Sequence, residues 1–187
     1  MSNEFQYDVL IIGSGASGLG LALQLPESYR IAVLSKADLT SGSTYQAQGG
    51  VAAVMDNSDS THAHIEDTIT AGANLSRRDA VTFTIEHGKE SIDWLIEQGV
   101  PFTRNGDEYH LTKEGGHSHR RIIHSADATG QAIQRTLIQR AIDSDNIDLF
   151  EDRIAVDLIT RHKLNLATNH CIGAYVLDNK SGHVDVF

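Results

Sequence analysis

The sequence has few of the features that mark secreted, membrane-embedded or nucleic-acid-binding proteins. Its 187 residues include one cysteine, Cys171, so the chain cannot form an internal disulfide and a reducing compartment is expected. It begins without the basic and apolar regions of a signal peptide, and no apolar run is long enough to span a membrane. Acidic residues outnumber basic ones by 25 to 15. We therefore expect a soluble cytoplasmic protein that binds neither nucleic acid nor membrane.

The sequence has only two prolines, and neither repeats nor low-complexity tracts interrupt it. Its length allows one domain with a sizeable core. Four large apolar residues at 9–12, a helical pattern at 19–25 and a second apolar run at 31–34 follow one another at the spacing of a βαβ unit. Such runs are typical of strands buried on both faces of a parallel sheet. We therefore predict an α/β fold of the Rossmann type with a central parallel sheet.

Three glycines stand between the first apolar run and the helix. Gly13 permits a tight turn, Gly15 lets a pyrophosphate approach the backbone, and Gly18 lets the helix pack closely on the strand. The phosphates would lie at the positive end of the helix dipole, so no basic side chain is required. The acidic residue expected after the second strand is absent, because Ser35 and Lys36 stand there. The loop predicts a dinucleotide site but leaves the choice of cofactor open.

Small polar residues and paired glycines fill residues 40–50. This composition is typical of backbone that lies against a flat ligand, where larger side chains would intrude. A flexible surface loop is the alternative. We favour ligand binding, because the segment follows a nucleotide-binding pattern and carries hydroxyls and amides instead of charges.

Helical and extended patterns alternate along the rest of the chain. The expected helices are one that begins after Asp59 or Ser60 as its cap, one over 77–98 that stops at Gly99, and one over 129–144 capped by Asp127 or Thr129. The expected extended segments are 147–150, 154–160, 171–177 and 183–187, with hairpin turns at Asn105-Gly106 and 179–182. Because the sequence ends within a strand pattern, we expect it to be the N-terminal piece of a longer protein.

The segment 112–121 holds the densest group of chemically active side chains. His117 and His119 share one face of an extended chain and could ligate a metal together with His124 or a carboxylate. Arg120 and Arg121 oppose a bound cation and favour the alternative, a segment that binds an anion and orients a substrate. A solvated charged loop is the third interpretation. We expect no metal site.

Several blocks of sequence, in this order, resemble the L-aspartate oxidase family, which belongs to the flavoproteins of succinate dehydrogenase and fumarate reductase. The resemblance runs from Asp8 to about Ala174 and is far more specific than the glycine loop alone. The blocks are residues 13–18, 34–36, 42–50, 66–68, 113–121 and 126–130. The resemblance implies an α/β, Rossmann-like FAD-binding domain with a central parallel sheet and a β-meander.

The resemblance implies that FAD binds without a covalent bond, because Ser43 stands where the dehydrogenases carry a flavin-linking histidine. The pyrophosphate would lie on Ser14 to Ser17, the adenosine side near Lys36 and the backbone of Ile154, and the flavin along 43–50. The implied cofactor contacts are Gly13, Ser14, Gly15, Ala16, Ser17, Gly18, Lys36, Ser43, Thr44, Tyr45, Gln46, Ala47, Gln48, Gly49, Gly50, Ile154 and Ala155.

Glu114 matches the family's substrate-orienting glutamate. A carboxylate that faces the substrate amine selects an amino acid and repels a plain dicarboxylate. The implied reaction oxidises L-aspartate to iminoaspartate, with O2, which gives hydrogen peroxide, or fumarate as the acceptor. In the family this is the first step of NAD synthesis through quinolinate, so the quinolinate-forming enzyme is a candidate partner.

Two alternatives remain beside the oxidase. A succinate dehydrogenase or fumarate reductase flavoprotein is disfavoured by Ser43 and Glu114. An FAD-binding fragment without turnover is the other, because the resemblance places residues 1–187 in the N-terminal part of the FAD-binding domain. The family's catalytic arginine, its capping domain and its C-terminal helical domain would lie beyond Phe187, and we expect these residues alone to be inactive.

Overall fold

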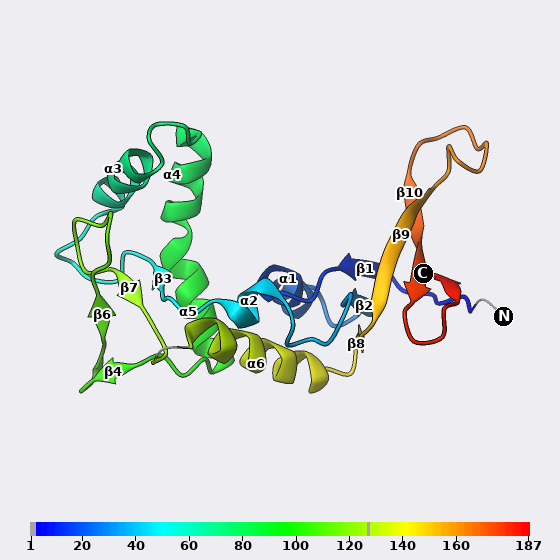
Figure 1. The fold of residues 1–187 in the computed structure, drawn as a ribbon, viewed down its shortest axis with the longest axis horizontal. Helices are drawn as coiled ribbons and strands as arrows, with labels where there is room; N and C mark the ends of the chain where they lie inside the picture. Colours follow the sequence, from blue (N-terminus) through cyan, green and yellow to red (C-terminus); the bar gives the residue numbers. More distant parts are fainter. Residues whose placement is uncertain (1–2, 127) are drawn as a thin grey trace. The chain divides into compact units, whose positions relative to one another are not determined.

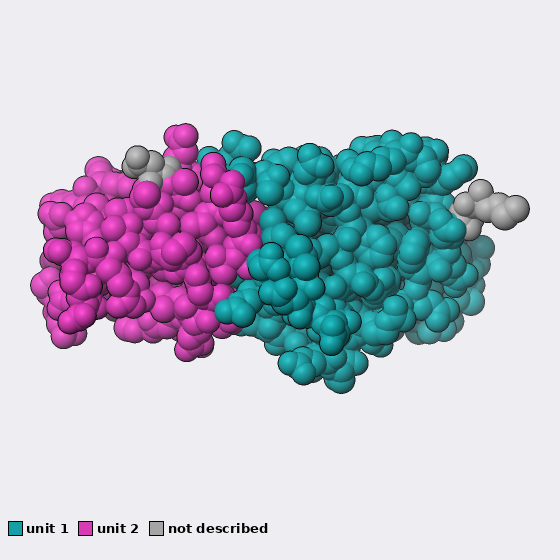
Figure 2. Space-filling view, turned by 90° about the horizontal axis from the view of Figure 1, so that it is seen from below, with its two compact units in different colours: residues 1–46, 137–187 teal, residues 47–136 magenta. Residues whose placement is uncertain are grey.

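The computed structural model describes residues 3–126 and 128–187. The chain divides into two compact units, which Figure 2 shows in different colours. Unit 1 comprises residues 1–46 and 137–187, and unit 2 comprises residues 47–136. Among the described residues, none of the helices is both long and apolar enough to cross a membrane.

Unit 1 is built on the predicted parallel sheet (Figure 1). Its strands are β1 (Val9–Ile12), β2 (Ile31–Leu34) and β8 (Ile147–Phe150), in the order β1-β2-β8. Helix α1 (Ala16–Gln24) connects β1 to β2, which pair in parallel, as predicted for a βαβ unit. Every residue of β2 is buried, whereas in β1 only Ile11 is buried. The expected burial of β1 on both faces is therefore wrong, because β1 lies at an edge of this sheet and is incompletely covered.

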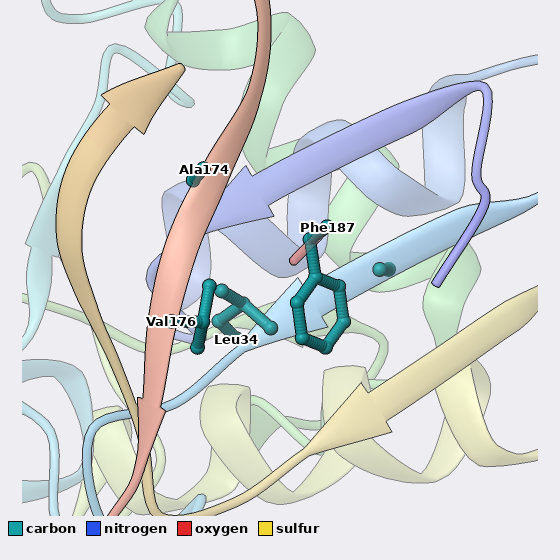
Figure 3. Close-up of a cluster of buried hydrophobic side chains, with 5 residues drawn as sticks. Leu34, Ala174, Val176 and Phe187 are labelled. Atoms are coloured by element: carbon teal, nitrogen blue, oxygen red, sulfur yellow. The ribbon is translucent and has the colours of Figure 1, made fainter. Parts of the chain in front are cut away.

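Three antiparallel strands form the predicted meander in unit 1. They are β9 (Arg153–Thr160), β10 (Cys171–Asp178) and β11 (Val184–Val186), in the order β11-β10-β9. The meander packs on β2 through a cluster of buried side chains, shown in Figure 3, in which Leu34 meets Val176 and Phe187. The ring of Phe5 stacks on Phe187 with centroids 4.5 Å apart. A short helix, α2 (Ser43–Gln46), also belongs to this unit.

Three helices build one part of unit 2: α3 (Thr61–Ala71), α4 (Arg78–Glu86) and α5 (Gly88–Gln98). The Ser60 hydroxyl caps α3 by accepting the Ala63 N–H at 3.1 Å, as predicted. The single helix predicted over 77–98 is wrong, because it is interrupted at His87, which precedes Gly88 and has φ −93° and ψ 1°. Glycine is unfavourable in a helix interior, which is consistent with a break at this point. Gly99 ends α5 in the left-handed conformation, as predicted.

Short strands complete unit 2. They are β3 (Val51–Ala52), β4 (Arg104–Asn105), β5 (Glu108–Tyr109), β6 (Leu111–Thr112) and β7 (Ile122–Ile123). The turn predicted at Asn105-Gly106 joins β4 to β5, with Gly106 at φ +65°. The sheet of β3, β7 and β6 is antiparallel. It carries the segment 113–121 as the connection between β6 and β7.

The last helix, α6, runs from Thr129 to Ile142 and ends two residues earlier than predicted. Thr129 is the first residue of this helix and therefore not its cap. Its hydroxyl accepts a hydrogen bond from the N–H of Ser125, before the helix, at 3.0 Å. The other predicted cap, Asp127, lies outside the described residues.

Candidate functional site

A cavity of about 440 Å³ opens in unit 1 where the parallel strands end. Four segments that are distant in the sequence line it: the glycine loop, the end of β2, the residues before and within α2, and the start of β9. The lining residues are Ile12, Gly13, Ser14, Gly15, Leu34, Ser35, Lys36, Ser41, Gly42, Ser43, Thr44, Arg153, Ile154 and Ala155. Ligands of open α/β sheets bind at this edge, outside the carboxyl ends of the strands.

The glycine loop has the geometry that its sequence predicts. Gly13 has φ +121°, which disfavours any side chain, and its N–H donates to the Leu34 carbonyl at 2.9 Å. A Cβ atom on Gly18 would lie 1.9 Å from the Gly13 carbonyl oxygen. No real side chain tolerates that contact, so Gly18 is needed for α1 to pack against the loop.

The N-terminus of α1 is suited to an anion. Gly15 occupies the cap position, and within this fully described helix neither a side-chain cap nor an acidic residue in the first turn is present. Backbone N–H groups in a first helical turn have no intrahelical carbonyl partner. The Ala16 N–H donates to the Thr44 hydroxyl at 3.1 Å, so α2 is tied to the glycine loop. A Cβ on Gly15 would approach the same hydroxyl to 3.3 Å, so a side chain at this position would require Thr44 to shift by a few tenths of an ångström.

Lys36 and the first residues of β9 lie at the same cavity, as the resemblance implied. Lys36 is exposed, and Ile154 and Ala155 line the wall beside it. Backbone bonds hold these segments together, because the Ser35 N–H donates to Phe150 and its carbonyl accepts from the Arg153 N–H, at 2.7 and 2.8 Å. The cavity also includes Ser41 and Gly42, which belong to the segment 40–50 predicted to bind a ligand, and Ser35 and Arg153, which were not predicted as contacts.

The available signal for Arg153 was its place immediately before the extended segment expected at 154–160. Its Nη1 pairs with Asp178 Oδ1 at 2.7 Å, and its buried Nε has no hydrogen-bond partner among the described residues. The side chain is four-fifths covered, since its exposed fraction is 18%. The ion pair of Arg153 joins the start of β9 to the end of β10 beside the cavity.

A second cavity, of about 580 Å³, lies in unit 2. Its lining residues are Gln48, Gly49, Gly50, Thr112, Glu114, His124 and Ala126. A Cβ on Gly50 would lie 2.4 Å from Ile122 Cγ2 and 2.5 Å from the Ile123 carbonyl oxygen, so this backbone must approach β7 closely. The structure thus places predicted flavin-side residues and the predicted substrate residue around one space. Thr112 and Ala126 also line this cavity, although the sequence pointed only to the segment 112–121 and the block 126–130 that contain them.

Glu114 presents a free carboxylate to this cavity. It is exposed, and within the described residues its side chain makes neither a hydrogen bond nor an ion pair. An unpaired carboxylate at a cavity wall attracts a cationic group, such as an ammonium. The arrangement therefore fits the selective role that the resemblance assigned to Glu114.

His124 lines the same cavity as Glu114 and is paired with a second histidine. Its Nε2 lies 2.9 Å from His110 Nδ1, and its Nδ1 lies 3.3 Å from the Ala126 carbonyl oxygen. A carbonyl only accepts, so His124 Nδ1 carries the proton. In the neutral ring Nε2 is then an acceptor, and His110 donates to it. The sequence suggested His124 only as a metal ligand, whereas in the structure its two ring nitrogens contact His110 and the Ala126 carbonyl.

Arg121 binds neighbouring carboxylates, a possibility that the sequence left open beside a part in binding an anion. The side chain is fully buried, with an exposed fraction of 0%. Its Nε and Nη2 donate to the two carboxylate oxygens of Asp59, and its Nη1 donates to Asp67, all at 2.7 Å. The guanidinium is therefore neutralised by two carboxylates. Arg120 is exposed, and its Nε donates to the Leu111 carbonyl at 3.0 Å.

These ion pairs shift the pKa values of the carboxyl groups. Burial alone would raise the pKa of Asp67, but hydrogen bonds from Ser118 and Arg121 outweigh it and lower the pKa to about 2. Burial likewise opposes the ionised form of Asp59, yet Arg121 and the Ser60 N–H hold its pKa below the ordinary value. Both groups are thus charged at neutral pH.

Other predicted residues lie outside the two cavities. Ala16, Ser17 and Gly18 form the first turn of α1, Tyr45 and Gln46 belong to α2, and the Ala47 carbonyl accepts the Gly130 N–H at 3.1 Å. His117 and His119 lie outside these cavities as well. Among the described residues, no three histidine, cysteine or acidic side chains are grouped to hold a metal ion.

Curated proteins similar to this chain include L-aspartate oxidases from several bacteria. The chain is 61% identical to the L-aspartate oxidase of Pseudomonas aeruginosa and 52% identical to that of Acinetobacter baylyi, in both cases over its whole length. It spans about a third of these curated relatives, 36% and 35% of their lengths.

Solved structures agree on the fold. The chain superposes on a mutant of the quinol fumarate reductase of E. coli with a TM-score of 0.88 and 28% identity, covering 98% of this chain and 31% of that one. It superposes on the Sdh1 complex of Mycobacterium smegmatis with a TM-score of 0.88 and 26% identity, covering 99% and 33%. The fold class predicted from the sequence is confirmed.

A family described as an FAD binding domain matches residues 8–187, nearly the whole chain. FAD is the cofactor that this match indicates, in agreement with the glycine loop and its cavity. The chain belongs to the FAD binding domain family.

Proposed function

We propose that this chain is the FAD-binding part of an L-aspartate oxidase, which oxidises L-aspartate to iminoaspartate as the first step of NAD synthesis. The observation that carries the substrate assignment is the unpaired carboxylate of Glu114, exposed beside Gly49 and Gly50 in one cavity. The 61% identity to an L-aspartate oxidase supports it. The proposed acceptors are O2, which gives hydrogen peroxide, and fumarate. We place the enzyme in the cytoplasm, with the quinolinate-forming enzyme as a candidate partner.

The residues of unit 1 fit the adenosine and pyrophosphate of FAD. The open N-terminus of α1 and the missing side chain of Gly15 leave room for phosphate oxygens, and the cavity continues to Lys36 and Ala155. On the flavin side we assign the backbone of residues 43–50. When bound, FAD accepts a hydride from the substrate. The protein binds and orients both molecules.

We propose that FAD is held without a covalent bond. Ser43 is exposed at the cavity, and a serine hydroxyl is a poor substitute for the histidine that links flavin in the related dehydrogenases. All of the proposed cofactor contacts in unit 1 are backbone groups or short polar and apolar side chains, with Lys36 as the cationic exception.

Glu114 would act on the substrate by charge. Its carboxylate binds the substrate ammonium and fixes the Cα–H bond in one direction, which favours transfer of that hydrogen. Succinate has no ammonium, so the negative charge of Glu114 would repel its carboxylates without any compensating attraction. His124 donates from Nδ1 to Ala126 and keeps the cavity wall in one arrangement.

The flavin spectrum of the whole enzyme under anaerobic conditions tests the proposed activity. Addition of L-aspartate is expected to bleach the flavin absorbance, whereas succinate at the same concentration leaves it unchanged. Bleaching by succinate alone would assign the protein to the dehydrogenase branch of these flavoproteins. A flavin that responds to neither compound would indicate an FAD-binding protein without this turnover. Precipitation with acid should leave the flavin in the supernatant, and flavin in the pellet would contradict non-covalent binding.

Replacement of Glu114 by glutamine tests the substrate contact. The change removes the negative charge and keeps the shape, so we expect kcat/KM for L-aspartate to fall about 10- to 100-fold, because a hydrogen bond between charged groups contributes about 1.5–3 kcal/mol. FAD binding should not change. Steady-state kinetics and an FAD titration measure the two effects. An unchanged catalytic efficiency would refute the role given to Glu114.

A further inference from the structure

The segment that carries Glu114 is a loop closed at its base by the main chain. The Arg121 N–H donates to the Thr112 carbonyl at 3.2 Å, which joins the two ends of the loop. Two consecutive glycines follow Glu114, and Gly116 has φ +85°. Glycines give a backbone many accessible conformations. The position of the Glu114 carboxylate therefore depends on contacts made elsewhere in the loop, since the side chain has no partner within the described residues.

The far side of this loop is bound to α3 through one oxygen atom. Asp67 Oδ2 accepts the Ser118 N–H and the Ser118 hydroxyl, each at 2.7 Å. The same atom accepts Arg121 Nη1 at 2.7 Å. One carboxylate oxygen thus binds both the tip and the base of the loop. A second contact, from Lys113 Nζ to the Ser118 carbonyl at 3.0 Å, lies within the loop itself.

Asp67 is in turn held in a fixed position. It lies in the second half of α3 and has a side-chain exposure of only 19%. Arg121, which it binds, is itself fixed by two hydrogen bonds to the fully buried Asp59. A network whose members are all satisfied restricts movement more than isolated surface bonds do. The rigid part of unit 2 therefore extends through Asp67 to Ser118, four residues from Glu114.

We propose that Asp67 is a positioning residue for substrate selection, which holds the loop so that the Glu114 carboxylate faces the substrate ammonium. This rests on the proposed function, because it gives Glu114 a substrate to select. Asp67 is not among the residues that line the cavity, and the proposal gives it no contact with the substrate. It acts through Ser118, and its effect is on where Glu114 lies, not on whether FAD binds.

Two variants of Asp67 separate the loss of its charge from the loss of its acceptor oxygen. All three donors bind Asp67 Oδ2. Asp67→Asn keeps an oxygen at that place and removes the charge, whereas Asp67→Ala removes the acceptor altogether. Glu66→Gln is the matched control, because Glu66 is the neighbouring residue on the same helix and its hydrogen bonds come from the exposed Arg78. In both Asp67 variants Arg121 keeps its two bonds to Asp59, so the fold retains its buried ion pair.

The experiment compares these variants and Glu114→Gln in the whole enzyme, by steady-state kinetics and by hydrogen exchange of the loop amides. For Asp67→Ala we expect KM for L-aspartate to rise about tenfold with kcat changed less than about twofold, because displacements on the order of 1 Å at a site cost up to about 100-fold. Asp67→Asn should recover most of this loss. Exchange at the Ser118 amide should quicken in Asp67→Ala only, and Glu66→Gln should match the wild type.

Three results would overturn the proposal. One is an unchanged KM in Asp67→Ala when Glu114→Gln does raise it. Another is an equal loss in Asp67→Asn and Asp67→Ala accompanied by loss of bound FAD, which would assign Asp67 to the stability of the unit. The third is wild-type exchange at Ser118 in Asp67→Ala. If instead Glu114→Gln has no effect, the proposed function fails, and faster exchange in Asp67→Ala would still support the positioning of the loop.

Discussion

Replacing Gly18 by alanine is expected to raise the dissociation constant for FAD about 10- to 100-fold. The added Cβ would lie 1.9 Å from the Gly13 carbonyl oxygen and 3.3 Å from Ile11 Cγ2. Both atoms belong to packed main chain or core, so neither can move freely. Relief of the contact requires α1 to shift away from the glycine loop, and such overpacking costs about 1–3 kcal/mol. The phosphates bind where this shift occurs. An FAD titration followed by flavin fluorescence measures the loss.

The helix propensity of alanine opposes the steric effect of this substitution. Alanine is favoured over glycine in a helix interior by about 1 kcal/mol, and Gly18 lies within α1. We expect the steric conflict to exceed this gain, because the conflict is with backbone. Gly88→Ala is the matched control: a Cβ there would meet only Ala53 Cβ at 3.9 Å, and Gly88 begins helix α5. That variant should bind FAD normally. Normal binding by Gly18→Ala would contradict the assigned packing role.

The local features of this fold were predictable from the sequence because they depend on neighbouring residues. The βαβ unit follows from apolar runs and a glycine loop, and the structure confirms the pairing of Val9 with Ile31. The turn at Gly106 and the stop at Gly99 follow from conformations that glycine alone adopts readily. The gathering of Ser43 and Ile154 at one cavity came instead from the resemblance, since no local pattern places such distant residues together.

Sequence reasoning failed where the outcome depends on a partner that is distant in the chain. The sequence left open whether Arg121 faces a ligand or neighbouring carboxylates. In the structure it binds Asp59, which precedes the cap of α3, and Asp67, which lies within α3. Nothing in the spacing of 54 and 62 residues reveals that contact. The break at His87 was missed for a different reason. The apolar periodicity continues across α4 and α5, and the weak helix propensity of Gly88 was outweighed in the prediction.

Replacing Arg121 by methionine is expected to lower the free energy of unfolding at neutral pH by about 3–5 kcal/mol, the usual cost of leaving a buried charge uncompensated. The methionine fills much of the same volume, so lost packing is a small part of the effect. Asp59, with an exposed fraction of 0%, would lose the guanidinium that neutralises it, and Asp67 would lose one of its three donors. Denaturant unfolding followed by circular dichroism measures the change. Arg120→Met is the matched control, and because Arg120 is exposed it should change stability by less than about 0.5 kcal/mol.

The pH dependence separates this electrostatic cause from a general loss of packing. In the wild type the pKa of Asp67 is lowered to about 2, so its ion pair stabilises the fold above the unfolded pKa near 3.8 and is lost as the pH falls through 2. Asp59 has a lowered pKa and acts in the same direction. In Arg121→Met the sign reverses, because a buried carboxylate without a cation has a raised pKa. Acidification then neutralises the unpaired charges, and the deficit relative to wild type should shrink as the pH falls from 7 to 4. A deficit that stays constant over this range would show that the ion pairs do not cause it.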